Sequence, residues 1–307
     1  MVLGGRHLNL ARPQLVGVLN LTPDSFSDGG DLPTLDAAVK RAHQLVAAGA
    51  DLLDIGGEST RPGAQPVDIH DEIARVVPVV AAVARQVHIP VCIDTRRSEV
   101  ARLALAAGAV AVNDTSGQVL LAMAQAVREF GAAWVLMHAP HALGAMDWSQ
   151  SAADFPVQTE AGVYLVGQDL VAMVAQALQF GVGRSQLAID PGIGFGKTAA
   201  QNFALLRCPP ALHTIGLPVY IGPSRKSFLV SMLPAISAPA PRDRLGATAA
   251  AVTVAILHGA AFVRVHDVAA MRQVVDVAVV LRDMAASEKT TVLTASGASG
   301  RHGSQEK

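Results

Sequence analysis

Short apolar runs alternate with longer amphipathic stretches along almost the whole chain. The apolar runs predict β-strands at Gln14–Asn20, Asp51–Ile55, Val91–Asp94, Ala111–Asn113, Ala133–Met137, Leu187–Asp190, Val219–Ile221 and Phe262–His266. The amphipathic stretches predict helices at Leu35–Ala48, Ile69–Gln86, Glu99–Ala107, Val119–Phe130, Tyr164–Phe180, Ala199–His213, Arg242–His258 and Val268–Ala285. Several of these helices are followed by a glycine just before the next strand, where glycine best accepts the left-handed helix cap.

The predicted strands are apolar throughout, which is typical of a parallel sheet covered by helices on both faces. Repeated strand–helix units in a chain of 307 residues predict an α/β fold, a single-domain (β/α)8 TIM barrel. A doubly wound open sheet is the alternative. We expect residues 1–13 to form an N-terminal extension and residues 14–285 the barrel. Residues 286–307 are small, polar and rich in Gly and Ser, which predicts a disordered tail.

Composition narrows the class of protein. Hydrophobic residues make up 51% of the chain and charged residues 16%, which is ample for a large core. A net charge of -1 gives no general reason to bind nucleic acid or a membrane surface. Two cysteines, Cys92 and Cys208, are too few for a disulfide framework. We therefore expect a protein of the reduced cytoplasmic compartment.

Polar and glycine residues are concentrated in the segments that follow strands, whereas the segments that follow helices are short and plain. The chemically rich segments begin at Asn20, Gly56, Asp94, Asn113, His138, Asp190, Gly222 and Arg264. In a barrel these segments all emerge at the carboxyl ends of the strands, where barrel enzymes hold their active sites. The asymmetry therefore predicts one site on that rim.

Three carboxylate or carboxamide residues end predicted strands: Asp94, Asn113 and Asp190. Together they could hold a ligand that presents N–H donors, because a carboxylate accepts two adjacent N–H groups and its charge strengthens both bonds. The alternative is that each residue caps the helix that follows, a position where Asp and Asn are favoured.

Cationic side chains follow the last two predicted strands. Arg264 and His266 lie two residues apart and so project to the same side of a strand, where they suit a phosphate or a planar ring. Lys226 stands within Ser224-Arg225-Lys226-Ser227, which could bind an anion or a carboxylate at a helix start. The alternative for each basic group is an ordinary solvated surface residue.

The segment Gly192-Ile-Gly-Phe-Gly-Lys-Thr198 is similar to a phosphate-binding P-loop. That pattern requires a glycine at the position where this chain has Pro191, so we reject it. We expect the glycines instead to let the backbone approach a bound ligand closely.

Eight blocks, in order, resemble the dihydropteroate synthase family: GVLNLTPDSFSDGG, DIGGESTRPGA, IDTRRSEVA, VNDTSG, LMH, IDPGIGFGK, SRKSF and RVHDV. The resemblance implies a (β/α)8 barrel, usually a homodimer, that acts in folate biosynthesis as a transferase forming a C–N bond. Such enzymes condense 7,8-dihydropterin-6-ylmethyl diphosphate with 4-aminobenzoate, assisted by Mg2+, and release diphosphate and 7,8-dihydropteroate. The family is also a sulfonamide target.

The resemblance implies a role for each matching residue. The pterin would be held by Asp94, Asn113, Asp190 and Lys226 and lined by Met137 and Phe195, with Arg264 over its face. The diphosphate would meet Arg264, His266, Thr60 and Arg61, which with Lys226 form the implied catalytic set. The aminobenzoate would be framed by Phe26, Pro62, Lys226 and Ser227. Asn20 would ligate Mg2+, helped by Asp28. The chain departs from the family pattern after His138, in the loop that runs to Gly162.

Two other functions remain open at the level of sequence. A pterin-binding paralogue or methyl-carrier domain would share the Asp and Asn pocket, but it would not need the diphosphate-facing Arg264, His266 and Lys226 segments. A non-catalytic protein that binds pterin without turnover is the third possibility, and only a measurement of activity separates it from a synthase.

Overall fold

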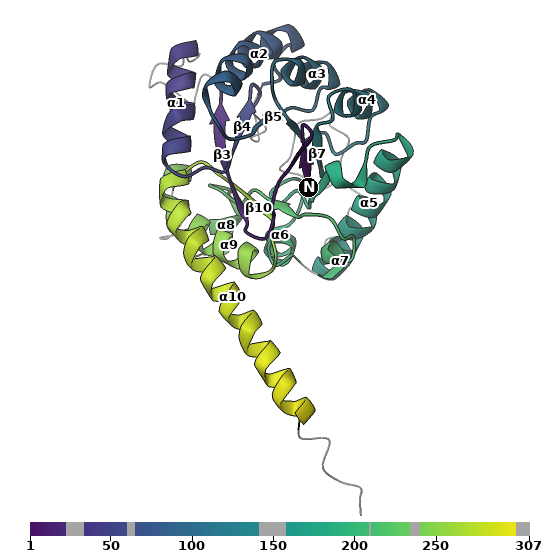
Figure 1. Ribbon diagram of the computed structural model, residues 1–307, viewed down its shortest axis with the longest axis vertical. Helices are drawn as coiled ribbons and strands as arrows, with labels where there is room; N and C mark the ends of the chain where they lie inside the picture. Colours follow the sequence, from purple (N-terminus) through teal and green to yellow (C-terminus); the bar gives the residue numbers. More distant parts are fainter. Residues whose placement is uncertain (23–33, 60–64, 141–157, 209, 234–239, 299–307) are drawn as a thin grey trace, which may run out of the picture.

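The computed structural model describes residues 1–22, 34–59, 65–140, 158–208, 210–233 and 240–298. Eight parallel strands run in the order β8-β7-β6-β5-β4-β3-β10-β9. A parallel bridge between Ile189 of β8 and Val219, next to β9, brings the two edges of this sheet together. Figure 1 shows the strands in the middle and helices around them. The fold is therefore a nearly closed (β/α)8 barrel, as the sequence predicts, and the open-sheet alternative is wrong.

The strands and helices follow one another in alternation. The strands of the barrel are β3 (Gln14–Asn20), β4 (Leu52–Gly56), β5 (Val91–Asp94), β6 (Ala111–Asp114), β7 (Ala133–Met137), β8 (Leu187–Asp190), β9 (Tyr220–Ile221) and β10 (Phe262–Val265). The helices are α1 (Leu35–Ala47), α2 (Ile69–Gln86), α3 (Ser98–Ala106), α4 (Leu121–Glu129), α5 (Thr159–Gln179), α6 (Ala199–Leu206), α7 (Pro210–His213), α8 (Phe228–Ser231), α9 (Leu245–Leu257) and α10 (Val268–Ala298). Most predicted elements therefore lie where the hydrophobic pattern places them.

The helices differ from the prediction in four places. Helix α5 begins at Thr159 instead of Tyr164, and the short helix α8 is not predicted by the pattern. The stretch expected as one helix from Ala199 to His213 is divided into α6 and α7, because Cys208 adopts a left-handed backbone conformation with φ 41° and Pro210 starts the second piece. Helix α10 continues past Ala285 to Ala298 and projects from the barrel in Figure 1. The helix predicted to end at Ala285 is therefore longer than expected, whereas the division of the chain at residue 286 stays a prediction. Residues 299–307 lie outside the described residues.

Side-chain alternation along the strands separates two hydrophobic cores. Strand residues of one parity, such as Leu53 and Ile93, pack with the helices in the larger core. Residues of the other parity, such as Leu52 and Cys92, pack inside the barrel. Since the side chains of a strand alternate between its faces, residues two positions further along point into the same interior, nearer its carboxyl end.

A short antiparallel hairpin, β1 (Val2–Leu3) and β2 (Arg6–His7), closes the amino-terminal end of the barrel. Leu3 is buried and belongs to the interior core, and Figure 1 shows the N-terminal segment lying across this end. The N-terminal extension is therefore part of the fold, although the sequence pattern gave no indication of it.

Helix α5 is long and apolar enough, by length and composition, to span a membrane. Its buried residues, among them Val166 and Leu170, belong to the core between helices and barrel. It contacts β7, α6 and α7, which is the arrangement of a core helix in a barrel.

Candidate active site

The register of the barrel brings the predicted polar residues to one level. Asn20 pairs across the sheet with Gly56, Gly56 with Asp94, and Asp94 with Asn113. On the next strands Met137 pairs with Asp190. All of these positions are the last or next-to-last residues of their strands, so their side chains meet at the carboxyl end of the barrel. The strand ends therefore form one site.

A carboxylate that the sequence analysis did not single out, Asp54 of β4, joins this group. Asp54 is fully buried, and its Oδ2 accepts hydrogen bonds from Arg264 Nε at 2.5 Å and from Asn113 Nδ2 at 3.1 Å. Arg264 also donates from Nη2 to Asp94 Oδ2 at 2.7 Å. The parity of β4, with Leu52 pointing inward two residues earlier, was the signal that could have found Asp54.

Burial and nearby charges shift the pKa values of this cluster. Removal from water, together with the charge of Asp54, raises the pKa of Asp94 to about 7, although Arg264 opposes the shift. Burial would lower the pKa of Arg264, but the two carboxylates outweigh it and raise the pKa above its usual value. Arg264 therefore stays charged, whereas Asp94 takes up a proton near neutral pH in the free protein.

The opposite side of the site is formed by β8 and the segments after β8 and β9. Asp190 Oδ1 accepts a hydrogen bond from the backbone N–H of Gly192 at 2.7 Å. Lys226 donates to the carbonyl of Ile193 and lies 4.3 Å from the centre of the Phe195 ring, a cation–π contact. Burial lowers the pKa of Lys226 to about 8, opposed mainly by the charge of Asp190. Met137 is buried beside Asp190 in the register.

The glycines after β8 fit against the protein's own chain. A Cβ at Gly192, whose φ is +65°, would lie 1.9 Å from the carbonyl oxygen of His138, and one at Gly194 would lie 2.7 Å from Lys226. Lys197 donates to the carbonyls of Gly192, Phe195 and His138 at 2.9, 3.1 and 3.3 Å. These contacts place Lys197 against backbone carbonyls, consistent with rejecting a P-loop. The close approach that requires glycine here is to backbone and Lys226.

Arg225, the neighbour of Lys226, is turned to a different partner. It adopts a left-handed conformation with φ 62° and pairs with Asp267 at 2.6 and 3.0 Å. Ser224 Oγ lies 3.0 Å from His266 Nδ1 and also accepts from the backbone N–H of His266. Of the Ser224–Ser227 segment, Lys226 therefore reaches the strand-end site directly. Ser227 is exposed and precedes α8, a helix of only four residues.

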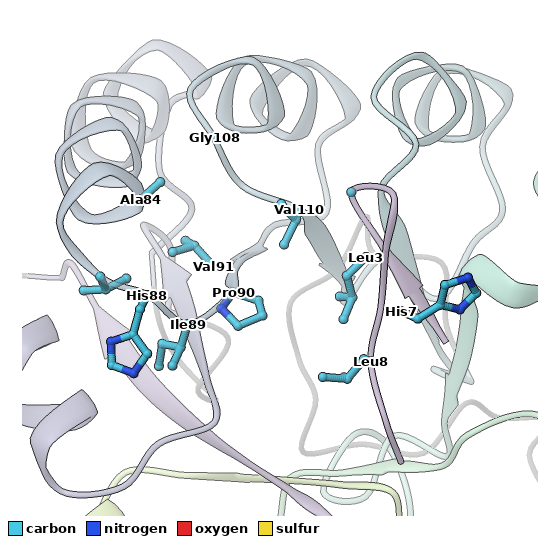
Figure 2. A pocket seen from close by; sticks show the side chains of 12 residues that line it. Leu3, His7, Leu8, Ala84, His88, Ile89, Pro90, Val91, Gly108 and Val110 are labelled. Atoms are coloured by element: carbon cyan, nitrogen blue, oxygen red, sulfur yellow. The ribbon is translucent and has the colours of Figure 1, made fainter.

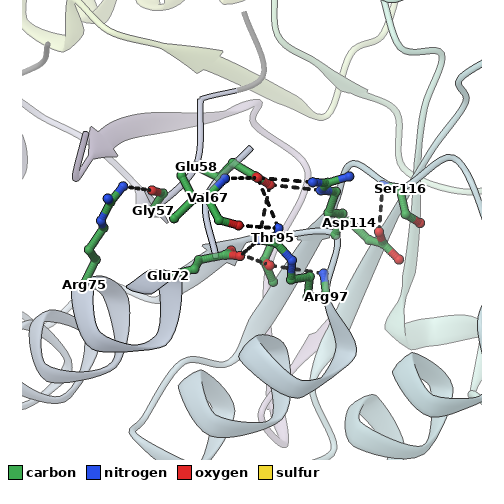
Figure 3. A network of polar contacts seen from close by, with 10 residues as sticks. Gly57, Glu58, Val67, Glu72, Arg75, Thr95, Arg97, Asp114 and Ser116 are labelled. Atoms are coloured by element: carbon green, nitrogen blue, oxygen red, sulfur yellow. Dashed lines mark hydrogen bonds and ion pairs between the residues drawn. The ribbon is translucent and has the colours of Figure 1, made fainter. Parts of the chain in front are cut away.

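A network of ion pairs holds the segment after β4 (Figure 3). Glu58 accepts from Arg96 Nε at 2.9 Å, and Arg97 donates to the carbonyl of Val67 at 2.7 Å. Arg97 also pairs with Glu58 and with the buried Glu72. The network therefore fixes the chain on both sides of residues 60–64. Thr60, Arg61 and Pro62, like Phe26 and Asp28, lie outside the described residues.

The strand-end site has few side chains that could ligate a metal ion. The described residues contain no group of three or more His, Cys, Asp or Glu side chains that could hold a metal ion. Asn20 and Asp94 present oxygens on either side of Gly56: a Cβ built there would lie 3.7 Å from Asn20 Oδ1 and 3.5 Å from Asp94 Oδ2. This donor set fits Mg2+ only where waters and substrate oxygens complete the coordination, which is how Mg2+ is commonly bound.

A separate cavity of about 420 Å³ lies at the other end of the barrel (Figure 2). It is lined mainly by apolar residues of the N-terminal hairpin and the chain around the start of β5, with His7 and His88 as its titratable side chains. It contains none of the strand-end carboxylates, so we do not regard it as the active site.

Comparison with known proteins shows which family this chain is similar to. The pterin binding enzyme family matches residues 16–266. The dihydropteroate synthase of Mycobacterium leprae is 47% identical over 269 residues, 86% of this chain and 91% of the relative. The Xanthomonas albilineans dihydropteroate synthase with 4-aminobenzoic acid superposes with a TM-score of 0.79 at 40% identity, covering 89% of this chain and 94% of that one. The Yersinia pestis enzyme in a sulfonamide drug complex gives 0.81 at 34% identity, covering 92% and 99%.

Proposed function

The chain belongs to the dihydropteroate synthases of the pterin binding enzyme family, and we propose how its strand-end residues bind the substrates and support the condensation. The enzyme is a transferase that forms a C–N bond in folate synthesis. The observation that carries our assignment of residues is the cluster of Asp54, Asp94, Asn113 and Arg264 at the carboxyl end of the barrel.

We propose that the pterin lies between Asp94 and Asn113 on one side and Asp190 and Lys226 on the other. Asn113 Oδ1 is buried and has no hydrogen-bond partner among the described residues, so it is available to accept an N–H of the ring. The carboxylates accept adjacent ring N–H groups, and Lys226 donates to a ring acceptor. Buried Met137 and partly buried Phe195 line this space.

Arg264 and His266 are proposed to stabilise the leaving diphosphate. The C–O bond of the pterin substrate breaks, diphosphate leaves with the electron pair, and a cationic methylene remains on the pterin. The amine nitrogen of 4-aminobenzoate then bonds to this carbon, and the amine proton passes to water. Negative charge grows on the departing oxygen, so a permanently charged guanidinium at this position lowers the barrier. Ser224 orients the His266 ring through its contact with Nδ1, and we propose that the ring in this orientation faces the anion. Thr60 and Arg61 remain proposed members of this group.

Mg2+ is proposed to bind at Asn20, with Asp28 as a further ligand. The carboxamide oxygen of Asn20 is a hard donor of the kind Mg2+ prefers, and a single protein ligand is sufficient where diphosphate oxygens and waters supply the rest. When bound, the ion neutralises charge on the diphosphate. Isothermal titration of the protein with Mg2+ in the presence of inorganic diphosphate, for wild type and Asn20→Ala, tests this assignment. Equal metal affinity in both proteins would exclude Asn20 as a ligand of Mg2+.

The 4-aminobenzoate is proposed to bind between Lys226, Ser227, Phe26 and Pro62. Lys226 links the two substrates, because it lies at the pterin site and next to the exposed Ser227. Sulfonamides are expected to compete at this position, as the complex of the related Yersinia pestis enzyme suggests. Competition kinetics against 4-aminobenzoate, with wild type and Ser227→Ala, test the assignment; a sulfonamide that competes only with pterin diphosphate would contradict it.

A homodimer is the proposed assembly. Helix α10 exposes an apolar stripe formed by Val277, Val280, Leu281 and Met284, each between 48% and 59% accessible. This spacing places the four side chains on one face of a helix, and a second copy of the chain would cover it. Leu281→Arg should shift wild-type dimer to monomer in light scattering, whereas Asp283→Arg, at a position 61% exposed, should not. A monomeric wild type would refute the assembly.

Release of diphosphate tests the function as a whole. Purified protein supplied with pterin diphosphate, 4-aminobenzoate and Mg2+ should release diphosphate in step with dihydropteroate. Binding of pterin without turnover across a range of pH and metal concentration would identify the non-catalytic binding protein instead.

A further inference from the structure

We propose that Asp54 is a positioning residue that fixes the orientation of both Asn113 and Arg264 in the pterin pocket, an inference that rests on the proposed function. Asp54 lies in the interior of the barrel, two residues before the strand end at Gly56, and is fully buried. Its Oδ2 accepts from Asn113 Nδ2 and from Arg264 Nε, which come from β6 and β10. One carboxylate oxygen therefore connects groups from three strands.

The carboxylate decides which end of the Asn113 carboxamide faces the pocket. A carboxamide has a donor end and an acceptor end of nearly the same shape, so packing alone does not choose between them. An ionised carboxylate only accepts, and it therefore draws Nδ2 inward. Asn113 Oδ1 is left buried without a partner among the described residues, available to a ligand N–H. Asp54 thus makes Asn113 an acceptor toward the substrate.

The same oxygen orients the guanidinium of Arg264. Arg264 donates one hydrogen bond from Nε to Asp54 and another from Nη2 to Asp94. Two carboxylates therefore hold two nitrogens of one planar group. A guanidinium bound at both positions cannot rotate freely about its side-chain torsions, and its plane is therefore set before substrate arrives. Its side chain is only 20% exposed, which limits competition from water.

A general stabilising role does not account for this arrangement well. The neighbouring inward positions, Leu52 on the same strand and Cys92 opposite Asp54, are apolar or weakly polar and pack in the interior core. Replacing a buried ion pair by apolar residues is often neutral or stabilising, so stability alone gives little reason for a carboxylate here. Both hydrogen-bond partners of Asp54, Asn113 and Arg264, are instead residues that we assign to substrate binding.

The variant Asp54→Asn keeps the shape of the side chain and removes its charge and its purely accepting character. Asp114→Asn is a matched control, because Asp114 is 1% exposed and accepts from Trp134 Nε1 at 3.1 Å and from Ser116 rather than from a pocket residue. We expect Asp54→Asn to raise the KM for pterin diphosphate at least about tenfold. The KM for 4-aminobenzoate should change by less than about twofold, and the control should leave both nearly unchanged.

A double-mutant cycle with Asn113→Ala separates positioning from general structure. If Asp54 acts through Asn113, the loss of pterin affinity in Asp54→Asn/Asn113→Ala will be smaller than the product of the two single losses. Independent, multiplicative losses would overturn the proposal, as would an unchanged KM for pterin diphosphate in Asp54→Asn. Should that variant not fold, Asp54→Ser, which keeps a small acceptor, gives the same comparison. Failure of the wild type to bind pterin would instead refute the proposed function.

Discussion

Replacing Asp190 by Asn tests the pterin pocket at a residue whose two carboxylate oxygens have different surroundings. Oδ1 accepts from the backbone N–H of Gly192 at 2.7 Å, and Asp190 is only 7% exposed. In the variant the carboxamide oxygen must keep facing Gly192, because its NH2 group cannot accept that hydrogen bond. The NH2 group would then face the pocket and meet the ring N–H groups donor to donor.

The magnitude follows from the bonds that are lost. Hydrogen bonds to a charged group contribute about 1.5–3 kcal/mol, and the ligand donors would be left buried and unpaired. We therefore expect pterin binding to weaken by about 2–3 kcal/mol, which corresponds to roughly 30- to 150-fold in Kd. Burial raises the pKa of Asp190, so the affinities of wild type and variant are compared over a range of pH.

Isothermal titration with a pterin gives the affinities, and urea unfolding shows whether the variant remains folded. Asp190→Ala is a useful second variant, because it removes the acceptor without introducing a donor and should lose no more affinity than Asp190→Asn. A folded Asp190→Asn protein that binds pterin within about threefold of wild type would refute the assignment of Asp190 to the pocket.

Three further predictions concern pH, charge geometry and stability. Because the pKa of Asp94 is raised to about 7 and ring N–H groups require its ionised form, pterin affinity should fall as pH drops below about 7; a flat titration between about pH 5.5 and 8 would contradict this. Arg264→Lys should lower kcat/KM roughly 10- to 100-fold, since Lys cannot donate to Asp54 and Asp94 as one planar fork; steady-state kinetics within about twofold of wild type would refute it. Glu72→Gln should lower the free energy of unfolding by about 2–3 kcal/mol in urea titrations, less than for a fully buried pair because Arg97 is 20% exposed. Asp283→Asn, at an exposed position, is its control and should change stability by under about 0.5 kcal/mol.

The sequence predicts some of the site and misses other parts for identifiable reasons. Asp94 and Asn113 end recognisable strands, so their meeting at one level follows from parallel register. Asp54 lies in the middle of an apolar strand, and strand parity places it on the interior face, but the sequence does not show that its partner there is Arg264. Arg225 and Lys226 are adjacent and equally charged, and only the left-handed turn at Arg225 shows that it pairs with Asp267.

The sequence by itself determines the alternation of strands and helices, because hydrophobic period and helix-ending glycines are local properties. It also determines that polar residues gather after strands, and parallel topology places these at one end of the barrel. Tertiary structure alone decides which of those groups touch. Asp54 and Arg264 are 210 residues apart in the chain, and their contact exists only because β4 and β10 flank β3 in a closed sheet. The same closure makes the N-terminal hairpin a cover for the interior, since its Leu3 has a core to join only after the strands have come together.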